Sequence, residues 1–280
     1  MRELAGKVAV VTGAGSGIGR ALAARLAAEG MSLMLADVDP GGLAETASRL
    51  ETSTGVAALT QITDVSDAVA VRHLADRAFG ELGAVHVLCN NAGVFQGGQM
   101  WTRAPEDFAW LLGVNLWGTL HGIHAFVPRM IAQESEGHIV NTVSVAGLFA
   151  APLAGGYSVS KYAAFAASQS LAQDLLMAGS RLRVTALCPG GVRTAINRSE
   201  RVRPENLLVA ERTEDEAFSV EMIDGLVERG IDPAEVAAAA VDAIREERFL
   251  ALTHPGYADG LREQTEALLA GRLPALPVYE

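Results

Sequence analysis

The chain has 280 residues, of which half are hydrophobic and only 5% aromatic, so we expect a large aliphatic core rather than a disordered chain. Its 22 basic and 33 acidic residues give a formal charge of −11. That balance argues against a nucleic-acid partner, which requires clustered Lys and Arg, and against docking on an anionic membrane surface.

The N-terminal residues and the cysteines point to the cytoplasm. Residues 1–12 lack the apolar region and cleavage site of a signal peptide, and no apolar run reaches the ~20 residues of a membrane span. Cys89 and Cys188 each close an apolar run and have no CxxC spacing. We therefore expect buried, reduced thiols rather than a disulfide or a metal site.

Short apolar runs alternate with helical patterns from the start of the chain. The strands are predicted at 7–12, 32–37, 56–62, 85–90, 138–143, 183–188 and 249–252, and the first two are followed by helices at 18–29 and 40–50. Alternation of this kind favours right-handed crossovers and a parallel sheet covered on both faces. The prediction is a doubly wound, Rossmann-type α/β sheet in which residues 1–280 form a single domain.

Three stretches depart from this alternation. Residues 93–105 are glycine-bearing and typical of a loop, and residues 189–230 form a connection of about forty residues. Connections of that length are lids, binding loops or disordered segments. We interpret residues 190–230 as a substrate lid in which Phe218, Met222 and Leu226 favour a short amphipathic helix. The tail, residues 271–280, is predicted to be extended and to pack on a neighbouring subunit.

A glycine-rich turn lies between the first strand and the first helix. Glycines let a backbone approach a pyrophosphate, which then meets the amides and the positive dipole of the helix N-terminus. Such a cluster can also serve only as a turn, but the strand before it and the helix after it favour a dinucleotide. The candidate cofactor residues here are Gly13, Ser16, Gly17, Ile18 and Gly19.

Asp37 ends the second strand, 24 positions after Gly13. A carboxylate at this place accepts hydrogen bonds from the adenosine ribose and repels a 2′-phosphate. The positions best placed to receive that phosphate, Ser16 and Val38, are not basic, so the sequence favours NAD over NADP. The structural alternative, a helix cap or a solvated acid at a strand end, suits Asp39 better, because Pro40 follows it.

Tyr157 and Lys161 stand four positions apart and would share one face of a helix. A neighbouring ammonium is expected to lower the phenol pKa toward the range that a general acid and base needs. Ser144 follows a strand, so its hydroxyl is placed to hold a substrate oxygen at the edge of the sheet. Tyrosine and lysine at this spacing are also common on solvated helix faces, so the pair alone is weak support.

The ordered set of motifs resembles the short-chain dehydrogenase/reductase family over roughly residues 5–255. It comprises the glycine turn, Asp64-Val65, the run 90–93, Asn115, Ser144, Tyr157 thirteen positions later, Lys161 and the run 189–194. The resemblance implies a catalytic tetrad of Asn115, Ser144, Tyr157 and Lys161, in which Asn115 holds a water for proton relay. It also implies cofactor contacts from Asp64, Val65, Asn91, Ala92, Gly93, Pro189, Gly190, Val192 and Thr194, besides Tyr157 and Lys161, and a homotetramer or a homodimer.

The substrate pocket is expected above the carboxyl ends of the strands. Its predicted lining is mostly apolar, and consists of Phe95, Val145, Ala146, Phe149, Leu153 and Gly191, with Leu148 as a further candidate. This lining favours a hydrophobic secondary alcohol or ketone. Arg193, Arg198 and Arg201 in the long connection are interpreted as surface charges rather than as a clamp for an anionic substrate.

The sequence therefore predicts an NAD-dependent oxidoreductase acting on a hydrophobic alcohol or ketone, with Tyr157 as general acid and base. Two alternatives stay open. One is an NADP-dependent carbonyl reductase of the same fold, and the other is a cofactor-binding regulatory protein that retains the tetrad.

Overall fold

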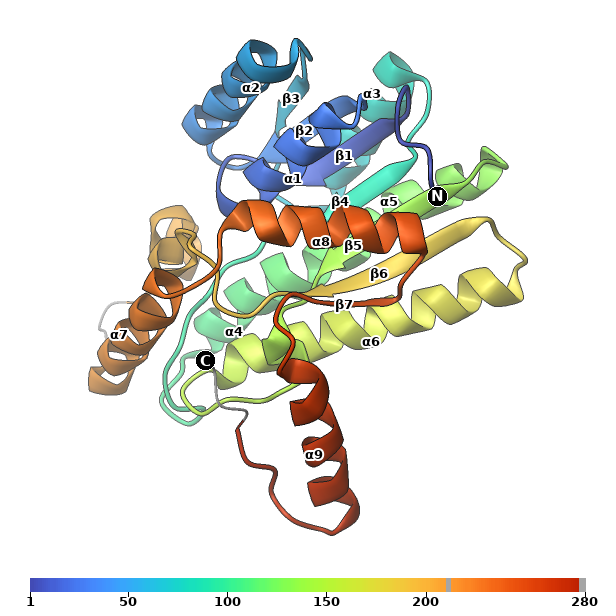
Figure 1. Ribbon diagram of the computed structural model, residues 1–280. Coiled ribbons are helices and arrows are strands. Elements are labelled where there is room, and N and C mark those ends of the chain that lie inside the picture. Colours follow the sequence, from blue (N-terminus) through green and yellow to red (C-terminus); the bar gives the residue numbers. More distant parts are fainter. Residues whose placement is uncertain (210–212, 277–280) are drawn as a thin grey trace.

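The computed structural model describes residues 1–209 and 213–276. Within them the chain folds around one parallel sheet of seven strands in the order β3-β2-β1-β4-β5-β6-β7 (Figure 1). The strands are β1 (Val8–Thr12), β2 (Ser32–Asp37), β3 (Leu59–Ile62), β4 (Val87–Asn90), β5 (Gly137–Thr142), β6 (Leu182–Cys188) and β7 (Leu250–Leu252). The single doubly wound sheet predicted from the sequence is confirmed.

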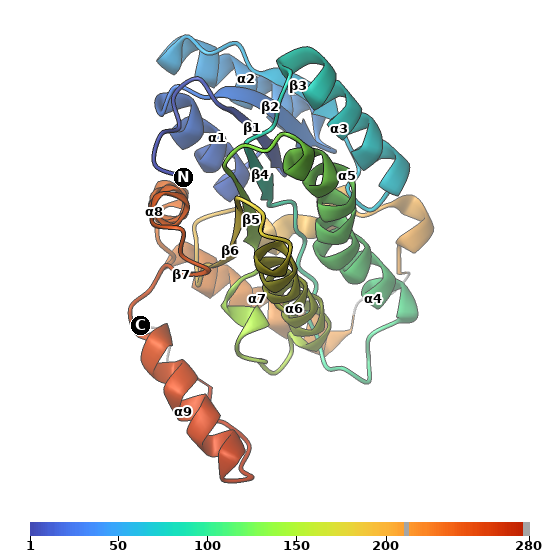
Figure 2. The same cartoon turned by 90° about the vertical axis from the view of Figure 1, so that its right-hand side faces the viewer.

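Helices cover both faces of this sheet (Figure 2). On one face, α1 (Gly17–Ala28), α2 (Pro40–Thr54) and α8 (Pro233–Glu246) bury Leu22, Leu50 and Val241 in a common core. On the other, α3 (Ala68–Leu82), α5 (Gly118–Ala132) and α6 (Gly155–Met177) enclose residues such as Leu74, Phe126 and Leu175. The near-continuous apolar runs of the central strands follow from this coverage on both sides.

The junction between α2 and β3 differs from the prediction for a local reason. The strand expected at 56–62 begins only at Leu59, because α2 continues to Thr54 and ends on Gly55 in the left-handed conformation. The Val56 amide then donates to the Thr54 hydroxyl instead of joining the sheet. Glycine is the residue best suited to such a helix end.

The stretch between β6 and α8 is largely helical. It holds 3₁₀ turns at Ile196–Val202 and Glu205–Leu207, followed by α7 (Glu214–Glu228). Three acidic residues occupy the first turn of α7, where carboxylates interact favourably with the helix dipole. The expected amphipathic helix is therefore present, and it is longer than the sequence suggested.

Three elements lie outside this alternation of strands and crossover helices. The segment 91–104 precedes α4 (Pro105–Leu112), and a π-helical turn at Gly113–Trp117 joins α4 to α5. Helix α9 (Tyr257–Leu269), which the sequence analysis did not anticipate, projects away from the body (Figures 1 and 2). Of the tail predicted to be extended, residues 272–276 are neither helix nor strand, and residues 277–280 lie outside the described part of the chain.

No helix in residues 1–209 or 213–276 is long and apolar enough to cross a membrane. Cys89 and Cys188 are both buried and unbonded, and burial raises the pKa of each thiol to about 12. The described side chains form no cluster of three or more His, Cys, Asp or Glu that could hold a metal ion.

Stability should depend on the core between α1 and α8. Leu22 is 0% exposed in that core, whereas Leu269 at the end of α9 is 85% exposed. We expect Leu22→Ala to lower the free energy of unfolding by about 2–5 kcal/mol, because it removes buried methyl groups and leaves a cavity. Leu269→Ala, the matched control, should change it by less than about 0.5 kcal/mol. Urea denaturation measures both, and equal effects would contradict this description of the core.

Candidate functional site

A cavity of about 780 Å³ opens at the carboxyl edge of the sheet. It lies where the chain order reverses between β1 and β4, the place at which open parallel sheets bind ligands. Its walls include every residue that the sequence analysis named for the cofactor. These residues come from separate strand ends, so the fold brings together a set dispersed over residues 13–194.

The glycine turn forms a cradle that side chains would fill. A Cβ on Gly19 would stand 2.0 Å from the Gly13 carbonyl oxygen, and one on Gly17 would meet the Thr194 methyl group at 2.9 Å. Gly13 and Gly17 also have positive φ values of 66° and 48°. Helix α1 begins here without a side-chain cap at Ser16, so its first amides remain available to an anion. The turn therefore fits a pyrophosphate.

Asp37 is tied to this turn. Its carboxylate accepts hydrogen bonds from the backbone amides of Gly15, at 2.7 Å, and of Asp39, at 3.0 Å. It is half-buried at the cavity wall, where a ribose would lie beside the turn. Asp39 instead caps α2 by accepting from the amides of Gly41 and Gly42, which is the division of roles predicted from Pro40.

The end of β4 is fixed to the end of β1 through Thr12. The Thr12 hydroxyl donates to the Cys89 carbonyl and accepts from the amides of Asn91 and Ala92 at 3.0 and 3.1 Å. The Asn91 side chain donates to the Thr12 carbonyl and accepts from the Thr142 hydroxyl. Asn91 therefore has a structural role in joining three strand ends, in addition to lining the cavity.

Ser144 and Tyr157 meet across the cavity wall. Ser144 follows β5 with a positive φ of 97°, a conformation that costs energy in a residue other than glycine and is concentrated at functional sites. Its hydroxyl accepts from the Ala146 amide at 3.2 Å and lies near enough to the Tyr157 phenol to act on the pKa of that phenol. The Tyr157 ring packs edge-on against Phe95, with 5.2 Å between the ring centroids. The two hydroxyls are thus held as a pair facing the cavity.

Lys161 lies one helical turn beyond Tyr157 on α6 and is 3% exposed. Its Nζ donates to the Thr142 carbonyl at 3.0 Å and stands 5.7 Å from the centroid of the Tyr157 ring. Burial lowers the pKa of Lys161 to about 8, because desolvation penalises the ammonium.

The expected direction of the Tyr157 pKa needs correction. Burial raises it to about 12, and the hydrogen bond with Ser144 acts in the opposite direction without reversing the shift. Desolvation disfavours the phenolate form of Tyr157 and raises the pKa. This effect exceeds the stabilisation of the phenolate by the Lys161 ammonium, which lies 5.7 Å from the ring centroid and is itself desolvated and hydrogen-bonded to the Thr142 carbonyl. Tyr157 is therefore a neutral phenol at physiological pH.

Asn115 is 1% exposed and lies behind the cavity wall rather than in it. It sits in the π-helical turn, a form often found at functional sites. Its amide accepts from the Val94 amide at 2.8 Å, and donates to the Val94 carbonyl and to the Ser160 hydroxyl at 3.0 and 2.9 Å. Asn115 thus fixes the segment after β4 against α6, and Ser160 is a partner that the sequence analysis missed.

The residues predicted to line a substrate pocket are found only in part in the wall of the cavity. Phe95, Val145, Ala146, Leu153 and Gly191 all line it. Phe149 does not, because its ring is buried in the core, 6.0 Å from that of Tyr257 between centroids. Leu148 is likewise buried elsewhere, and Arg193 and Arg198 are exposed outside the cavity, whereas Arg201 does line it.

Several wall residues were not anticipated, and they come from distant segments. They are Trp110 of α4, Val202, Pro204, His254, Tyr257 and Leu276, together with Ser219, Ile223 and Val227 of α7, which join the Met222 and Leu226 that the sequence had placed on a helix of the lid. The 3- and 4-residue spacing of the α7 set was a usable signal, because it marks one face of a helix. The wall residues outside α7 have no local sequence pattern that predicts a cavity.

Comparison with known proteins bears on this arrangement. The family model described as short chain dehydrogenase matches residues 7–205. Among curated proteins, 1-deoxy-11-beta-hydroxypentalenate dehydrogenase of Streptomyces avermitilis is 40% identical over 200 residues, covering 71% of this chain and 73% of its own. C alpha-dehydrogenase of a Sphingobium species is 29% identical over 275 residues, covering 98% and 89%.

Among solved structures, a short-chain dehydrogenase/reductase from Burkholderia phymatum in complex with NAD superposes with a TM-score of 0.96. It is 42% identical in sequence, and each chain is covered completely. The likeness therefore extends through the substrate end and the C-terminal elements, beyond the part that the family model matches.

Burial of Lys161 should make stability depend on pH. An unfolded lysine titrates near pH ~10.4, whereas Lys161 in the folded chain titrates at about 8. Between these values the unfolded chain binds more protons, so the free energy of unfolding rises with pH in this window. Relative to Lys161→Met, which has no such group, we expect the wild type to gain about 2 kcal/mol between pH 7 and pH 9.5.

The measurement is urea denaturation of both proteins at the two pH values. Subtraction cancels the groups that titrate in both. If the difference between the two proteins stayed constant with pH, Lys161 would not be a desolvated ammonium in the folded chain.

Proposed function

Because the chain belongs to the short-chain dehydrogenase/reductase family, we propose that it is an NAD-dependent oxidoreductase that interconverts hydrophobic secondary alcohols and ketones. The observation that carries the proposal is that the Ser144 and Tyr157 hydroxyls, the buried Lys161 and the glycine turn with Asp37 all face one cavity. A regulatory protein that only binds a nucleotide would have no need to hold Ser144 in a strained backbone conformation beside the Tyr157 phenol.

The cofactor assignment rests on the fit of the turn and on Asp37. The glycine cradle admits a pyrophosphate, and the Asp37 carboxylate lies where it would accept from a ribose hydroxyl and repel a 2′-phosphate. The solved relative from Burkholderia phymatum, which binds NAD, gives independent support. NAD, when bound, supplies or accepts the hydride, and the protein supplies position and proton transfer.

We assign the proton to the Tyr157 phenol. A tyrosine phenol is protonated near neutrality, and burial moves its pKa further up, so the form present is the one that carries a proton for a carbonyl oxygen during reduction. Ser144 orients that oxygen, because its hydroxyl already lies within hydrogen-bond reach of the phenol. Lys161 holds its ammonium at the same wall, one turn along α6, where it is placed to bind a ribose hydroxyl.

The substrate class follows from the walls. Phe95, Leu153, Val202, Ile223 and Leu226 make the far end of the cavity apolar. A ligand is therefore recognised there by burial of hydrocarbon surface, while its oxygen is held by Ser144 and Tyr157. The Streptomyces relative, whose name gives it a hydroxyl-bearing substrate, is consistent with this class.

We further propose that the chain assembles as a homotetramer. Trp117 beside α5 and Leu176 and Met177 at the end of α6 are large apolar residues that are 52%, 75% and 87% exposed. Association through these helices would remove that surface from water.

Tyr157 should be required for chemistry and not for cofactor binding. We expect Tyr157→Phe to lower kcat for ketone reduction by about 10²–10⁴-fold, because the proton donor is lost, while NADH binding measured by fluorescence stays within about twofold. Tyr162→Phe is the matched control on the same helix, since its hydroxyl donates to the Leu148 carbonyl away from the cavity. Wild-type turnover by the Tyr157 variant would refute the assignment.

Asp37 should determine the choice of cofactor. The wild type is expected to bind NADH more tightly than NADPH, and Asp37→Asn to reduce that preference about tenfold by removing one like charge beside the 2′-phosphate. The amide keeps an oxygen for the Gly15 amide, so the turn is preserved. Asp67→Asn, at the N-cap of α3 and outside the cavity, is the control. Tighter binding of NADPH by the wild type would overturn the assignment.

A further inference from the structure

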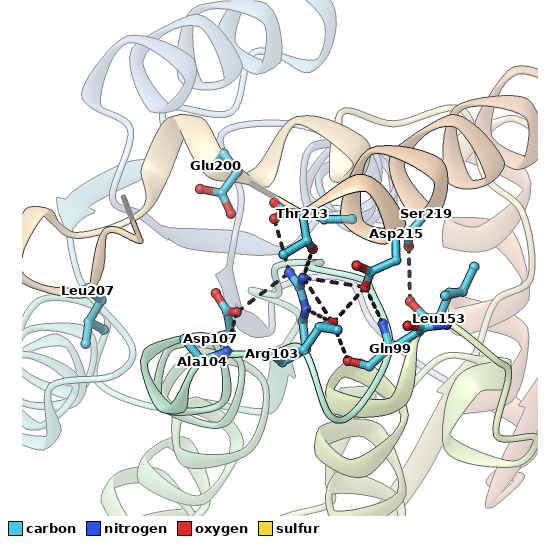
Figure 3. Close-up of polar contacts among 12 residues, drawn as sticks. Gln99, Arg103, Ala104, Asp107, Leu153, Glu200, Leu207, Thr213, Asp215 and Ser219 are labelled. Carbon is cyan, nitrogen blue, oxygen red and sulfur yellow. Dashed lines mark hydrogen bonds and ion pairs between the residues drawn. The ribbon is translucent and has the colours of Figure 1, made fainter. Parts of the chain in front are cut away.

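A buried cluster of ionic side chains joins the segment before α4 to the N-terminus of α7 (Figure 3). Its centre is Arg103, whose side chain is 5% exposed. The Arg103 guanidinium lies 3.1 Å from the Glu216 carboxylate and 3.5 Å from that of Asp215, and it also donates to the Thr213 hydroxyl. These three acceptors begin α7, more than a hundred residues along the chain.

The same contact is reinforced from the other side. The Asp215 carboxylate accepts from the Gln99 amide and from the Thr102 hydroxyl, both at 2.7 Å. These hydrogen bonds lower the pKa of Asp215 to about 2, so it stays ionised at physiological pH. The N-terminus of α7 is therefore held by charge and by hydrogen bonds to one short segment, residues 99–103.

Asp107 links this cluster to a second arginine. The Asp107 carboxylate lies 3.8 Å from Arg103 and 2.7 Å from Arg203, whose side chain is 3% exposed. Arg203 also pairs with Glu200 at 3.1 Å, and its guanidinium stands 4.9 Å from the Trp110 ring, which lines the cavity. The cluster thus connects both parts of the long β6–α8 connection to α4.

Apolar packing provides little of the attachment of α7. Phe218 and Met222 are 56% and 50% exposed, and the buried residues of the helix are the polar Glu216 and Ser219. Ser219 donates to the Leu153 carbonyl at 3.0 Å, and Asp224 accepts from the Asn197 amide. Yet Ser219, Met222, Ile223 and Leu226 form one wall of the cavity. A wall of the substrate site therefore depends mainly on polar contacts for its position.

We propose that Arg103 is a positioning residue for the substrate, which holds α7 against the segment before α4 and so sets the width of the apolar end of the cavity. The residue touches neither reacting atoms nor the cavity itself, and it acts through the helix. The expected effect of Arg103 on KM rests on the proposed function. The restraint that Arg103 places on residues 214–228 does not depend on that function.

Removing the central cation of such a cluster is costly, because the carboxylates that share it lose part of their compensation while they stay in a largely buried place. In Arg103→Met, the carboxylates of Asp107, Asp215 and Glu216 lose a shared cation and repel one another. Helix α7 then moves away from the wall, and contacts with a large apolar substrate are lost. The cofactor end, built on the strand ends, is unaffected.

The kinetic test compares a bulky secondary alcohol, 1-phenylethanol, with a small one, propan-2-ol. For Arg103→Met we expect KM for 1-phenylethanol to rise about tenfold, the scale of a lost apolar contact in a pocket. The kcat, the KM for propan-2-ol and NADH binding should change by less than about twofold. Arg103→Lys, which keeps the charge but not the fork of donors, should restore part of the KM.

A double-mutant cycle tests whether Arg103 acts through α7. Asp215→Asn alone should raise the same KM, and the double variant should show less than the product of the two single effects, because both remove one interaction. Arg129→Met is the control, since this arginine pairs with Asp76 on the opposite side of the molecule. Independent effects of Arg103 and Asp215, or an equal effect of Arg129→Met, would overturn the proposal.

Hydrogen exchange tests the restraint without any turnover. In Arg103→Met, amides of residues 214–228 should exchange about tenfold faster or more, while those of the central strands keep their protection. If the wild type oxidised and reduced none of these substrates, the proposed function would fail and the exchange result would still decide the role of Arg103. Unchanged exchange in α7, or equally faster exchange throughout the chain, would overturn that role.

Discussion

The site depends on the hydrogen bonds of one hydroxyl, that of Thr12, at the point where the chain order of the sheet reverses. Thr12 ends β1, and its hydroxyl donates to the carbonyl of Cys89 in β4 and accepts from the amides of Asn91 and Ala92, which follow β4. The connection that follows β1 and the connection that follows β4 lead to opposite faces of the sheet. A crevice therefore opens between them at the carboxyl ends of these two strands. The Thr12 hydroxyl keeps the two ends in register, so the glycine turn on one side and the segment 91–95 on the other face a common space. The Thr12 hydrogen bonds join the two strand ends at the floor of the crevice, and the space beyond them forms the cavity.

Burial then sets the chemistry of that space. Desolvation acts on Tyr157 and Lys161 in opposite directions, because the charged form is the phenolate in one and the ammonium in the other. Burial therefore favours the neutral form of each group, but at pH 7 a pKa of about 8 leaves Lys161 largely an ammonium, so the fold holds one buried cation beside a neutral phenol. The strained Ser144 belongs to the same arrangement, since it lines the cavity beside Tyr157 and its hydroxyl lowers the pKa of the phenol against the effect of burial.

Sequence reasoning was most successful where a fixed spacing along the chain indicates a function. Asp37 was placed by its distance from Gly13, and Tyr157 and Lys161 by their spacing on a helix, and all three line the cavity. It failed where tertiary packing decides. Phe149 stands in an apolar run beside the site, but the run turns after Ser144 and directs its ring into the core against Tyr257. The pKa of Tyr157 was misjudged for the same reason. A spacing of four residues shows that Lys161 is a neighbour, but it does not show that both side chains are removed from water.

The two ends of the cavity are therefore built by different means. The proposed cofactor end is built at the carboxyl ends of β1, β2, β3, β4 and β6, and most of its residues lie within a few positions of a strand that the core holds in place. The substrate end is assembled from α4, the 3₁₀ turns and α7, which meet through Arg103, Arg203 and their carboxylates. Ionic contacts between distant segments carry no sequence periodicity, so this end is hard to predict. For the same reason it can be rebuilt by changing a few side chains while the strand ends, and the cofactor they bind, stay as they are.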